Sequence, residues 1–316
     1  MHNLGIMVNN KCNAACVHCL YASSPKWDDE YITRENAKAL CKLLRSHGVY
    51  SVHIGGGEPF LNFEGLCTML EELKSAGISV DYIETNGFWC YDEQSAKEKI
   101  RRVKELFGNT LMVSCDPFHA EFVPVQRAID FVRWCRECGM DFFVWHDRYL
   151  RMFRRSGKDL SRPFTREELK EMFGDDYREQ TASEYGLSFN GRALGLLDTM
   201  VRPRPVAELL PMCKHELSRA FSTGHVDLNL KFWPHHCLGF GVDMEWVLEG
   251  AKEGRYPLLD MVRKQGLQGL YDFCVEKGFK AKDAYTSPCA LCMECKAFLA
   301  DKGYEEIYPK QYFENV

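Results

Sequence analysis

Residues 4–19 read LGIMVNNKCNAACVHC, a short apolar run followed directly by three cysteines. The apolar residues 4–8 predict a strand. In the loop that follows, Cys12, Cys16 and Cys19 have the spacing C-x3-C-x2-C. Thiolates are soft ligands that suit zinc or an iron–sulfur cluster. Three of them hold three irons of a [4Fe–4S] cluster and leave the fourth iron open, and an open metal position is where chemistry happens.

Strand-like and helix-like segments alternate downstream of this loop. The predicted strands are residues 51–54, 79–83, 111–114, 141–145 and 186–189, and the predicted helices are residues 34–47, 63–76, 93–107, 124–138 and 165–173. Strict alternation predicts parallel strands joined by right-handed crossovers. We therefore expect an α/β fold in which residues 1–200 form a partial (β/α)6 TIM-like barrel. In such barrels the reactive groups lie at the C-terminal ends of the strands.

The composition is that of a globular protein. The chain has 316 residues, of which 46% are hydrophobic, enough for one large domain and a smaller one. A net charge of −5 without a basic block gives no support for a nucleic-acid partner. The apolar runs are too short for a membrane span, and the N-terminus lacks the regions of a signal peptide. We therefore expect a cytoplasmic protein with no nucleic-acid or membrane partner. In that reducing compartment, clustered cysteines bind metal more often than they form disulfides.

Gly56, Gly57, Glu58 and Pro59 follow the second predicted strand. Glycine lets the backbone approach a ligand closely, and a carboxylate accepts hydrogen bonds from an ammonium group. Together with the cysteine spacing, this segment resembles the radical SAM superfamily, in which a GGE motif holds the methionine amino group of S-adenosylmethionine. The resemblance implies that the open iron binds S-adenosylmethionine. One-electron cleavage then gives a 5′-deoxyadenosyl radical that abstracts hydrogen from a substrate.

The same resemblance makes Cys12, Cys16 and Cys19 the catalytic cluster ligands. The alternative for these cysteines is a structural zinc knuckle. Zinc requires a fourth ligand, and His18 lies too close in sequence to Cys19 to be a natural one.

Polar residues also follow the third and fourth predicted strands. Thr85 and Asn86 belong to a TNG segment that, by resemblance, shapes the cofactor pocket; the alternative is a plain turn. Ser114 and Asp116 resemble family positions that contact the methionine carboxylate or the ribose of the cofactor. Asp116, which precedes a proline, could equally be the N-cap of a helix.

Arginines follow the fifth and sixth predicted strands. Arg148 and Arg192 could each clamp a carboxylate or phosphate of cofactor or substrate through two parallel hydrogen bonds. The alternative for each is a surface ion pair.

The pattern changes after about residue 200. Residues 202–205 read RPRP and predict a linker, residues 226–232 alternate like a hairpin strand, and residues 256–277 predict a helix. We expect residues 201–316 to form a smaller second domain.

A second group of cysteines lies in this C-terminal part: Cys213, Cys237, Cys289, Cys292 and Cys295. Their arrangement resembles the auxiliary-cluster domains called SPASM and twitch, and implies a second [4Fe–4S] cluster. Four ligands are needed; we favour the first four of these cysteines, and the alternative replaces Cys213 with Cys295. A zinc site is the other possibility. Fully ligated, the second cluster could only transfer electrons, whereas an open iron could bind substrate.

The function that follows is a radical SAM enzyme acting on a peptide or a small molecule, with an electron donor such as flavodoxin or ferredoxin. The first predicted strand begins at residue 4, so we expect no leader-peptide-binding domain before it, although a partner protein could supply one. The alternative from another class is a non-catalytic iron–sulfur electron carrier or scaffold. The segment at residues 55–59 argues against a carrier, which has no use for an amino-acid-chelating rim.

Overall fold

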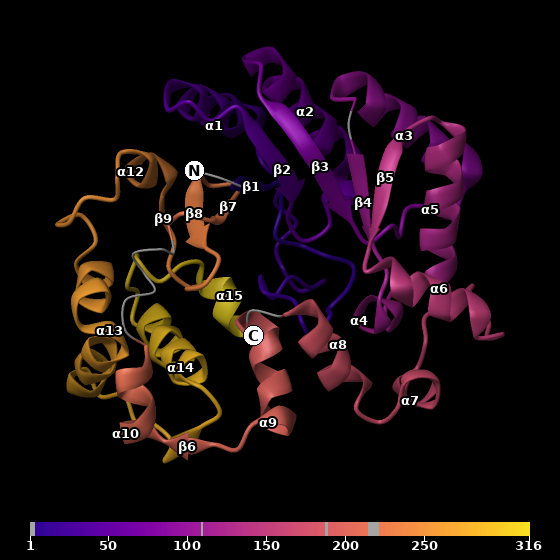
Figure 1. Cartoon of the computed structure of the whole chain (residues 1–316). Coiled ribbons are helices and arrows are strands. Elements are labelled where there is room, and N and C mark those ends of the chain that lie inside the picture. The colour runs from indigo at the N-terminus through magenta and orange to yellow at the C-terminus, as the bar shows by residue number, and fades with distance from the viewer. Residues whose placement is uncertain (1–3, 109, 187–188, 214–220) are drawn as a thin grey trace.

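The computed structural model describes residues 4–108, 110–186, 189–213 and 221–316 (Figure 1). A parallel sheet forms its N-terminal half. The sheet contains β1 (Leu4–Met7), β2 (Ser51–Gly55), β3 (Ser79–Thr85), β4 (Thr110–Ser114) and β5 (Asp141–Trp145). Each strand pairs in parallel with the next, as the alternating pattern predicted.

Four helices return the chain between these strands: α1 (Arg34–Ser46), α2 (Phe63–Ala76), α3 (Glu93–Leu106) and α5 (Val125–Glu137). They lie side by side along the outside of the sheet (Figure 1). Their ends are encoded locally. The side chains of Thr33 and Asp92 accept hydrogen bonds from amides in the first turns of α1 and α3. Helix α2 ends at Gly77, whose φ of +66° is left-handed.

The predicted sixth strand, residues 186–189, lies in part outside the described residues, which omit 187 and 188. Gly186 is the left-handed residue that ends α8 (Tyr177–Tyr185), and Phe189 has no regular structure. The free side of β1 is occupied instead by β7 (Gly224–Val226), which runs parallel to β1.

The predicted hairpin between Cys213 and Cys237 is present. It consists of β7 and β8 (Lys231–Pro234), and β9 (Val242–Asp243) extends it. The resulting sheet has the order β5-β4-β3-β2-β1-β7-β8-β9. The α/β partial barrel was therefore predicted correctly, but a hairpin from the C-terminal part flanks β1.

The remaining elements complete the chain. After β4 and β5 come α4 (Pro117–Ala120), α6 (Asp147–Arg155) and α7 (Arg166–Phe173); the C-terminal part adds α9 (Leu197–Met200), α10 (Val206–Leu209), α12 (Met244–Leu248), α13 (Pro257–Glu276), α14 (Pro288–Asp301) and α15 (Lys310–Asn315). Three 3-10 turns span Pro59–Asn62, Gly191–Leu196 and Leu210–Met212. The predicted linker is in part a strand, because β6 (Arg204–Pro205) pairs with β10 (Ala284–Tyr285).

One hydrophobic cluster joins the two halves of the chain. It contains Ile6 and Leu70 of the barrel as well as Leu259 and Leu299 of α13 and α14, all fully buried. Among the helices of the described residues, none has both the length and the apolar character to cross a membrane.

Candidate active site

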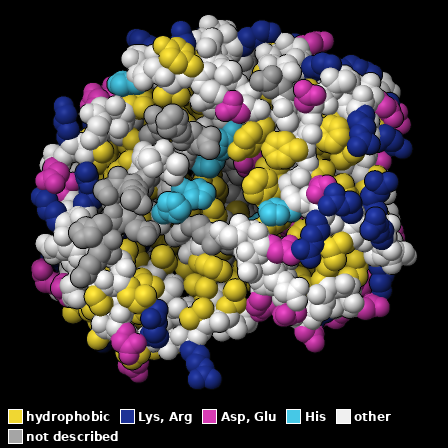
Figure 2. Space-filling model, viewed as in Figure 1, with side chains coloured by type: hydrophobic (Ala, Val, Ile, Leu, Met, Phe, Trp, Pro, Cys, Tyr) yellow, Lys and Arg dark blue, Asp and Glu magenta, His cyan; other side chains and the backbone are white. Residues whose placement is uncertain are grey.

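A pocket of about 370 Å³ lies at the C-terminal ends of the barrel strands. Its walls come from the loop after β1, the segment after β2, and the ends of β3, β4 and β5. Residues from α8, the turn that follows it and the loop after β8 complete the lining. Figure 2 shows several histidine side chains around the middle of this face, with hydrophobic side chains between them. The pocket lies where the barrel architecture predicts a reactive site.

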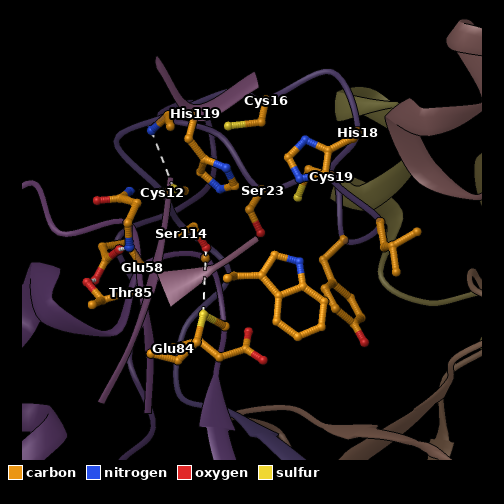
Figure 3. A pocket seen from close by; sticks show the side chains of 18 of the residues that line it. Cys12, Cys16, His18, Cys19, Ser23, Glu58, Glu84, Thr85, Ser114 and His119 are labelled. Atoms are coloured by element: carbon orange, nitrogen blue, oxygen red, sulfur yellow. Dashed lines mark hydrogen bonds between the residues drawn. The ribbon is translucent and has the colours of Figure 1, made fainter. Parts of the chain in front are cut away.

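Cys12, Cys16 and Cys19 all line this pocket, in the upper part of the view in Figure 3. Amide groups donate to one of the sulfurs: the N–H of Ala14 lies 3.4 Å and Nδ2 of Asn86 lies 3.7 Å from Sγ of Cys12. Burial raises the pKa of Cys12 to about 12, with a further contribution from Glu58. A metal that binds this thiol must therefore displace its proton. Three thiols on one loop are the donor set that a site-differentiated [4Fe–4S] cluster requires.

Gly56 and Gly57 are required by the packing of the cysteine loop. A Cβ on Gly57 would lie 1.9 Å from the carbonyl oxygen of Lys11, and one on Gly56, whose φ is +143°, would lie 2.7 Å from the carbonyl oxygen of Asn9. The N–H of Gly57 donates to Asn9 O and the N–H of Glu58 donates to Lys11 O, both at 2.9 Å. The GGE segment is thus joined to the cysteine loop by its backbone.

Glu58 is buried and its carboxylate accepts three hydrogen bonds. The donors are the hydroxyl of Thr85 at 2.7 Å, the N–H of Asn86 at 2.7 Å and the N–H of Phe60 at 3.1 Å. Asn86 also reaches the cysteine loop, where its amide donates to Asn13 at 2.8 Å. The TNG segment therefore connects Glu58 with the cysteine loop, and Pro59 lines the pocket beside it.

Ser114 and Asp116 have different surroundings. Ser114 lines the pocket, whereas Asp116 is fully buried and does not. The Asp116 carboxylate accepts from the N–H groups of Phe118 and His119 and caps α4. The helix-cap alternative is therefore the observed one. His119, whose ring nitrogen contacts the same carboxylate, also lines the pocket.

The two arginines also differ. Arg148 is exposed, does not line the pocket and pairs with Glu184. The surface ion pair, rather than the predicted contact with the cofactor, is therefore what the structure shows for Arg148, which lies in the first turn of α6, a helix that was not predicted. Arg192 does line the pocket. Its guanidinium donates to Cys16 O at 3.1 Å, Ser23 O at 2.5 Å and Asn315 O at 3.4 Å, so it holds the cysteine loop in place.

Comparison with known proteins agrees with this geometry. Residues 6–149 match the family described as the Radical SAM superfamily. This part of the chain, a little under half of it, is similar to a radical SAM domain.

Three similarities illustrate the relationship. YydG of Bacillus subtilis strain 168, whose name assigns it to peptide biosynthesis, is 29% identical over 129 residues, covering 39% of this chain and 39% of YydG. A probable GTP 3′,8-cyclase of Methanocaldococcus jannaschii is 29% identical over 140 residues, covering 42% of this chain and 45% of the cyclase. The structure of native anSMEcpe with bound AdoMet and Cp18Cys peptide has a TM-score of 0.43 at 12% identity, covering 99% of this chain and 100% of that one. The two sequence matches span less than half of each relative.

The pocket also contains a carboxylate that was not predicted from the sequence. Glu84, at the end of β3, lines the pocket together with Tyr82. Figure 3 shows it at the end of the pocket opposite the three cysteines. Because side chains alternate along a strand, Tyr82 and Glu84 share one face, while Ile83 between them is buried in the core. A charged residue at a barrel-facing position is the signal that could have identified it.

A histidine pair, of which His53 is buried and His225 half-buried, lies beside the pocket. His53 of β2 and His225 of β7 approach each other to 2.9 Å between their Nε2 atoms, and Nδ1 of His225 lies 2.5 Å from the hydroxyl of Tyr21. Gly5 of β1 leaves room for them, since a Cβ there would lie 2.1 Å from the ring of His225. Burial lowers the pKa of His53 to about 4, so the ring is neutral at pH 7. Tyr21 and Tyr82, which stacks on His53, connect the pair to the pocket wall.

Four of the C-terminal cysteines lie near one another. Burial raises the pKa of Cys237 to about 12, and the charges of Cys213, Cys289 and Cys292 raise it further. The ammonium group of Lys296, which is 3% exposed and donates to Leu238 O at 2.7 Å, opposes this shift.

Cys295 faces elsewhere. It is fully buried, and the thiol of Cys274 on α13 contacts its backbone oxygen at 3.7 Å. Cys289 and Cys292 lie three residues apart on α14 and so share a face, whereas Cys295 lies farther around the helix. This position beside Cys274 of α13 favours the ligand set with Cys213 over the set with Cys295, and both stay predictions.

Proposed function

We propose that the chain is a cytoplasmic radical SAM enzyme that abstracts hydrogen from a peptide or a small molecule. The observation that carries this proposal is a single pocket lined by the three thiols of Cys12, Cys16 and Cys19 and by the GGE segment, within the part of the chain that is similar to a radical SAM domain. The number of clustered cysteines favours a reducing compartment.

In this proposal Cys12, Cys16 and Cys19 hold a [4Fe–4S] cluster. A cluster bound there would supply the electron for reductive cleavage of S-adenosylmethionine. The chain's own residues hold the ligand loop and orient the cofactor. Gly57 and Glu58 fix one side of the loop through backbone hydrogen bonds, and Arg192 fixes the other through its guanidinium.

The cofactor-binding surface in this proposal consists of the pocket residues nearest the cysteine loop. Gly56, Gly57 and Glu58 provide the methionine end, with Pro59 beside them. Thr85 and Asn86 position Glu58 through their hydrogen bonds. Ser114 lines the same pocket, and in this proposal its hydroxyl contacts a carboxylate or hydroxyl of the cofactor.

We further propose that residues 201–316 form an auxiliary domain with a second [4Fe–4S] cluster. Its ligands are Cys213, Cys237, Cys289 and Cys292, whose mutual proximity supports the assignment. Four thiolates leave no iron open, so this cluster would transfer electrons rather than bind substrate. A flavodoxin or ferredoxin is the class of protein that would supply the electrons.

The substrate class is supported by the relatives and by the pocket. YydG is named for peptide biosynthesis and the other relative for a reaction of GTP. A triphosphate requires several available cations. Among the described residues lining the pocket, Arg192 is engaged by three carbonyls, and Glu84 presents a negative charge. The peptide is therefore the better candidate.

The test is anaerobic reconstitution with iron and sulfide, followed by dithionite and S-adenosylmethionine, with 5′-deoxyadenosine as the readout. We expect its formation by the wild-type chain and its loss in Cys16→Ala. If a chain holding about eight irons forms none, with or without added peptide, the electron-carrier alternative is favoured instead.

A further inference from the structure

We propose that Glu84 is the substrate-recognition residue of this pocket and that it pairs with a cationic group of the substrate, a protonated amine or a guanidinium. This inference rests on the proposed function, because it names the class of substrate that the same pocket would bind.

The Glu84 carboxylate lies at the C-terminal end of β3, on the pocket face that Glu84 shares with Tyr82. Opposite it on β2 is Gly55, where a Cβ would lie 3.2 Å from Oε2 of Glu84. The neighbouring strand therefore offers the carboxylate a bare backbone rather than a side chain.

In the part of the chain that the structure describes, no hydrogen bond and no ion pair joins the Glu84 carboxylate to another residue. Glu58, which lies nearby, accepts three hydrogen bonds by contrast. Burial raises the pKa of Glu84 to about 7, and the charge of Glu58 adds to this effect, while His119 opposes it. Glu84 is half-buried, and a carboxylate partly withdrawn from water without a partner is costly, so a ligand that supplies one gains binding energy.

The surroundings of Glu84 favour a positively charged ligand. Arg192 is engaged by three backbone carbonyls, and His119 by Asp116. Neither of these pocket residues bonds to Glu84. Tyr82 and Trp145 also line this pocket, and the faces of aromatic rings attract cations. A carboxylate with aromatic neighbours favours an amine or guanidinium carried on an apolar stem, as in a lysine or arginine side chain.

The cysteines that would hold the cofactor's cluster lie apart from Glu84. S-adenosylmethionine also carries an ammonium group, but the three cysteines lie at the other end of the pocket from Glu84 (Figure 3). Glu58 is hydrogen-bonded to the TNG segment beside Cys12. Glu84 is thus the pocket carboxylate that remains for a second ligand.

The experiment uses the full chain, reconstituted anaerobically with iron and sulfide and saturated with S-adenosylmethionine. Two probes are titrated: an acetylated, amidated Ala-Ala-Lys-Ala-Ala peptide and the same peptide with norleucine in place of lysine. We expect the wild-type chain to bind the lysine peptide roughly tenfold more tightly or better, which corresponds to one charge-assisted contact. Glu84→Gln should abolish this preference and leave the affinity for S-adenosylmethionine within about twofold. The control is Asp81→Asn, an exposed carboxylate on the same strand, which should keep the preference.

Three results would overturn the inference. In the first, the wild-type chain shows no preference for the lysine peptide or binds neither probe. Glu84→Gln could retain the preference. It could also lose affinity for S-adenosylmethionine by the same factor, which would make Glu84 a cofactor ligand. Because these readouts need no turnover, absence of 5′-deoxyadenosine alongside an intact preference would overturn the proposed reaction and not the cation site.

Discussion

The close contact between Gly57 and the cysteine loop makes Gly57→Ala the sharpest test of how the site is held. The added Cβ would lie 1.9 Å from Lys11 O, 2.3 Å from the Lys11 carbonyl carbon and 2.6 Å from Asn10 O. These are backbone atoms, so no side-chain rotation relieves the clash. An ordinary contact begins at 3.4 Å, so the loop must retreat by about 1.5 Å (3.4 minus 1.9).

Such a retreat breaks two hydrogen bonds. The bonds from Gly57 to Asn9 O and from Glu58 to Lys11 O are both 2.9 Å long, and an added 1.5 Å takes them beyond hydrogen-bonding range. Each buried group left without a partner costs about 1–3 kcal/mol, so we expect a loss of about 2–6 kcal/mol in the free energy of unfolding. The displaced loop carries Cys12 and should also bind less iron.

The assay combines urea denaturation of the apo chain with iron content after reconstitution. The matched control is Gly195→Ala, because a Cβ on Gly195 meets nothing within 4 Å. That variant should stay within about 0.5 kcal/mol of the wild type and bind iron normally. If Gly57→Ala unfolds and assembles iron as the wild type does, then the glycine is not required for loop packing, and its role would have to be direct contact with the cofactor.

The other predictions concern the two cysteine groups and the charges beside them. Cys16→Ala should abolish S-adenosylmethionine cleavage, whereas Cys289→Ala should leave part of it and abolish product formation; equal loss in both, with the first cluster still assembled, would contradict separate roles. Cys295→Ala should keep the iron of the second cluster, since its side chain faces α13, and a loss of about four irons would restore Cys295 as a ligand. Lys296→Met should make the reduction potential of the second cluster more negative by on the order of 60 mV, or ~1.4 kcal/mol for one electron, in an EPR-monitored titration; an unchanged potential would show that this buried charge does not act on the cluster. Arg192→Lys should lower the iron content of the first site, because an ammonium group cannot reach three separate carbonyls as a guanidinium does; full iron content would contradict its anchoring role.

Much of this protein is determined by its sequence alone, because the deciding interactions are local. Strands β1 to β5 and their outer helices follow from hydrophobic periodicity read over one element at a time. Caps such as Thr33 and Asp92 act within three residues of themselves. The spacing of Cys12, Cys16 and Cys19 puts three thiols on one loop whatever surrounds it. The GGE and TNG segments were also found correctly at the strand ends, where a parallel sheet brings them together.

Only the tertiary structure decided the partners of each group, because these come from distant parts of the chain. Strand β7 is three residues long and gains its place from pairing with β1, more than 200 residues earlier in sequence. Arg148 and Arg192 occupy similar positions in the sequence pattern, yet one meets Glu184 at the surface and the other meets the cysteine loop. Glu84 looked like the ordinary end of a strand. Whether a carboxylate has a partner depends on every element that packs around it, and spacing along the chain does not carry that information.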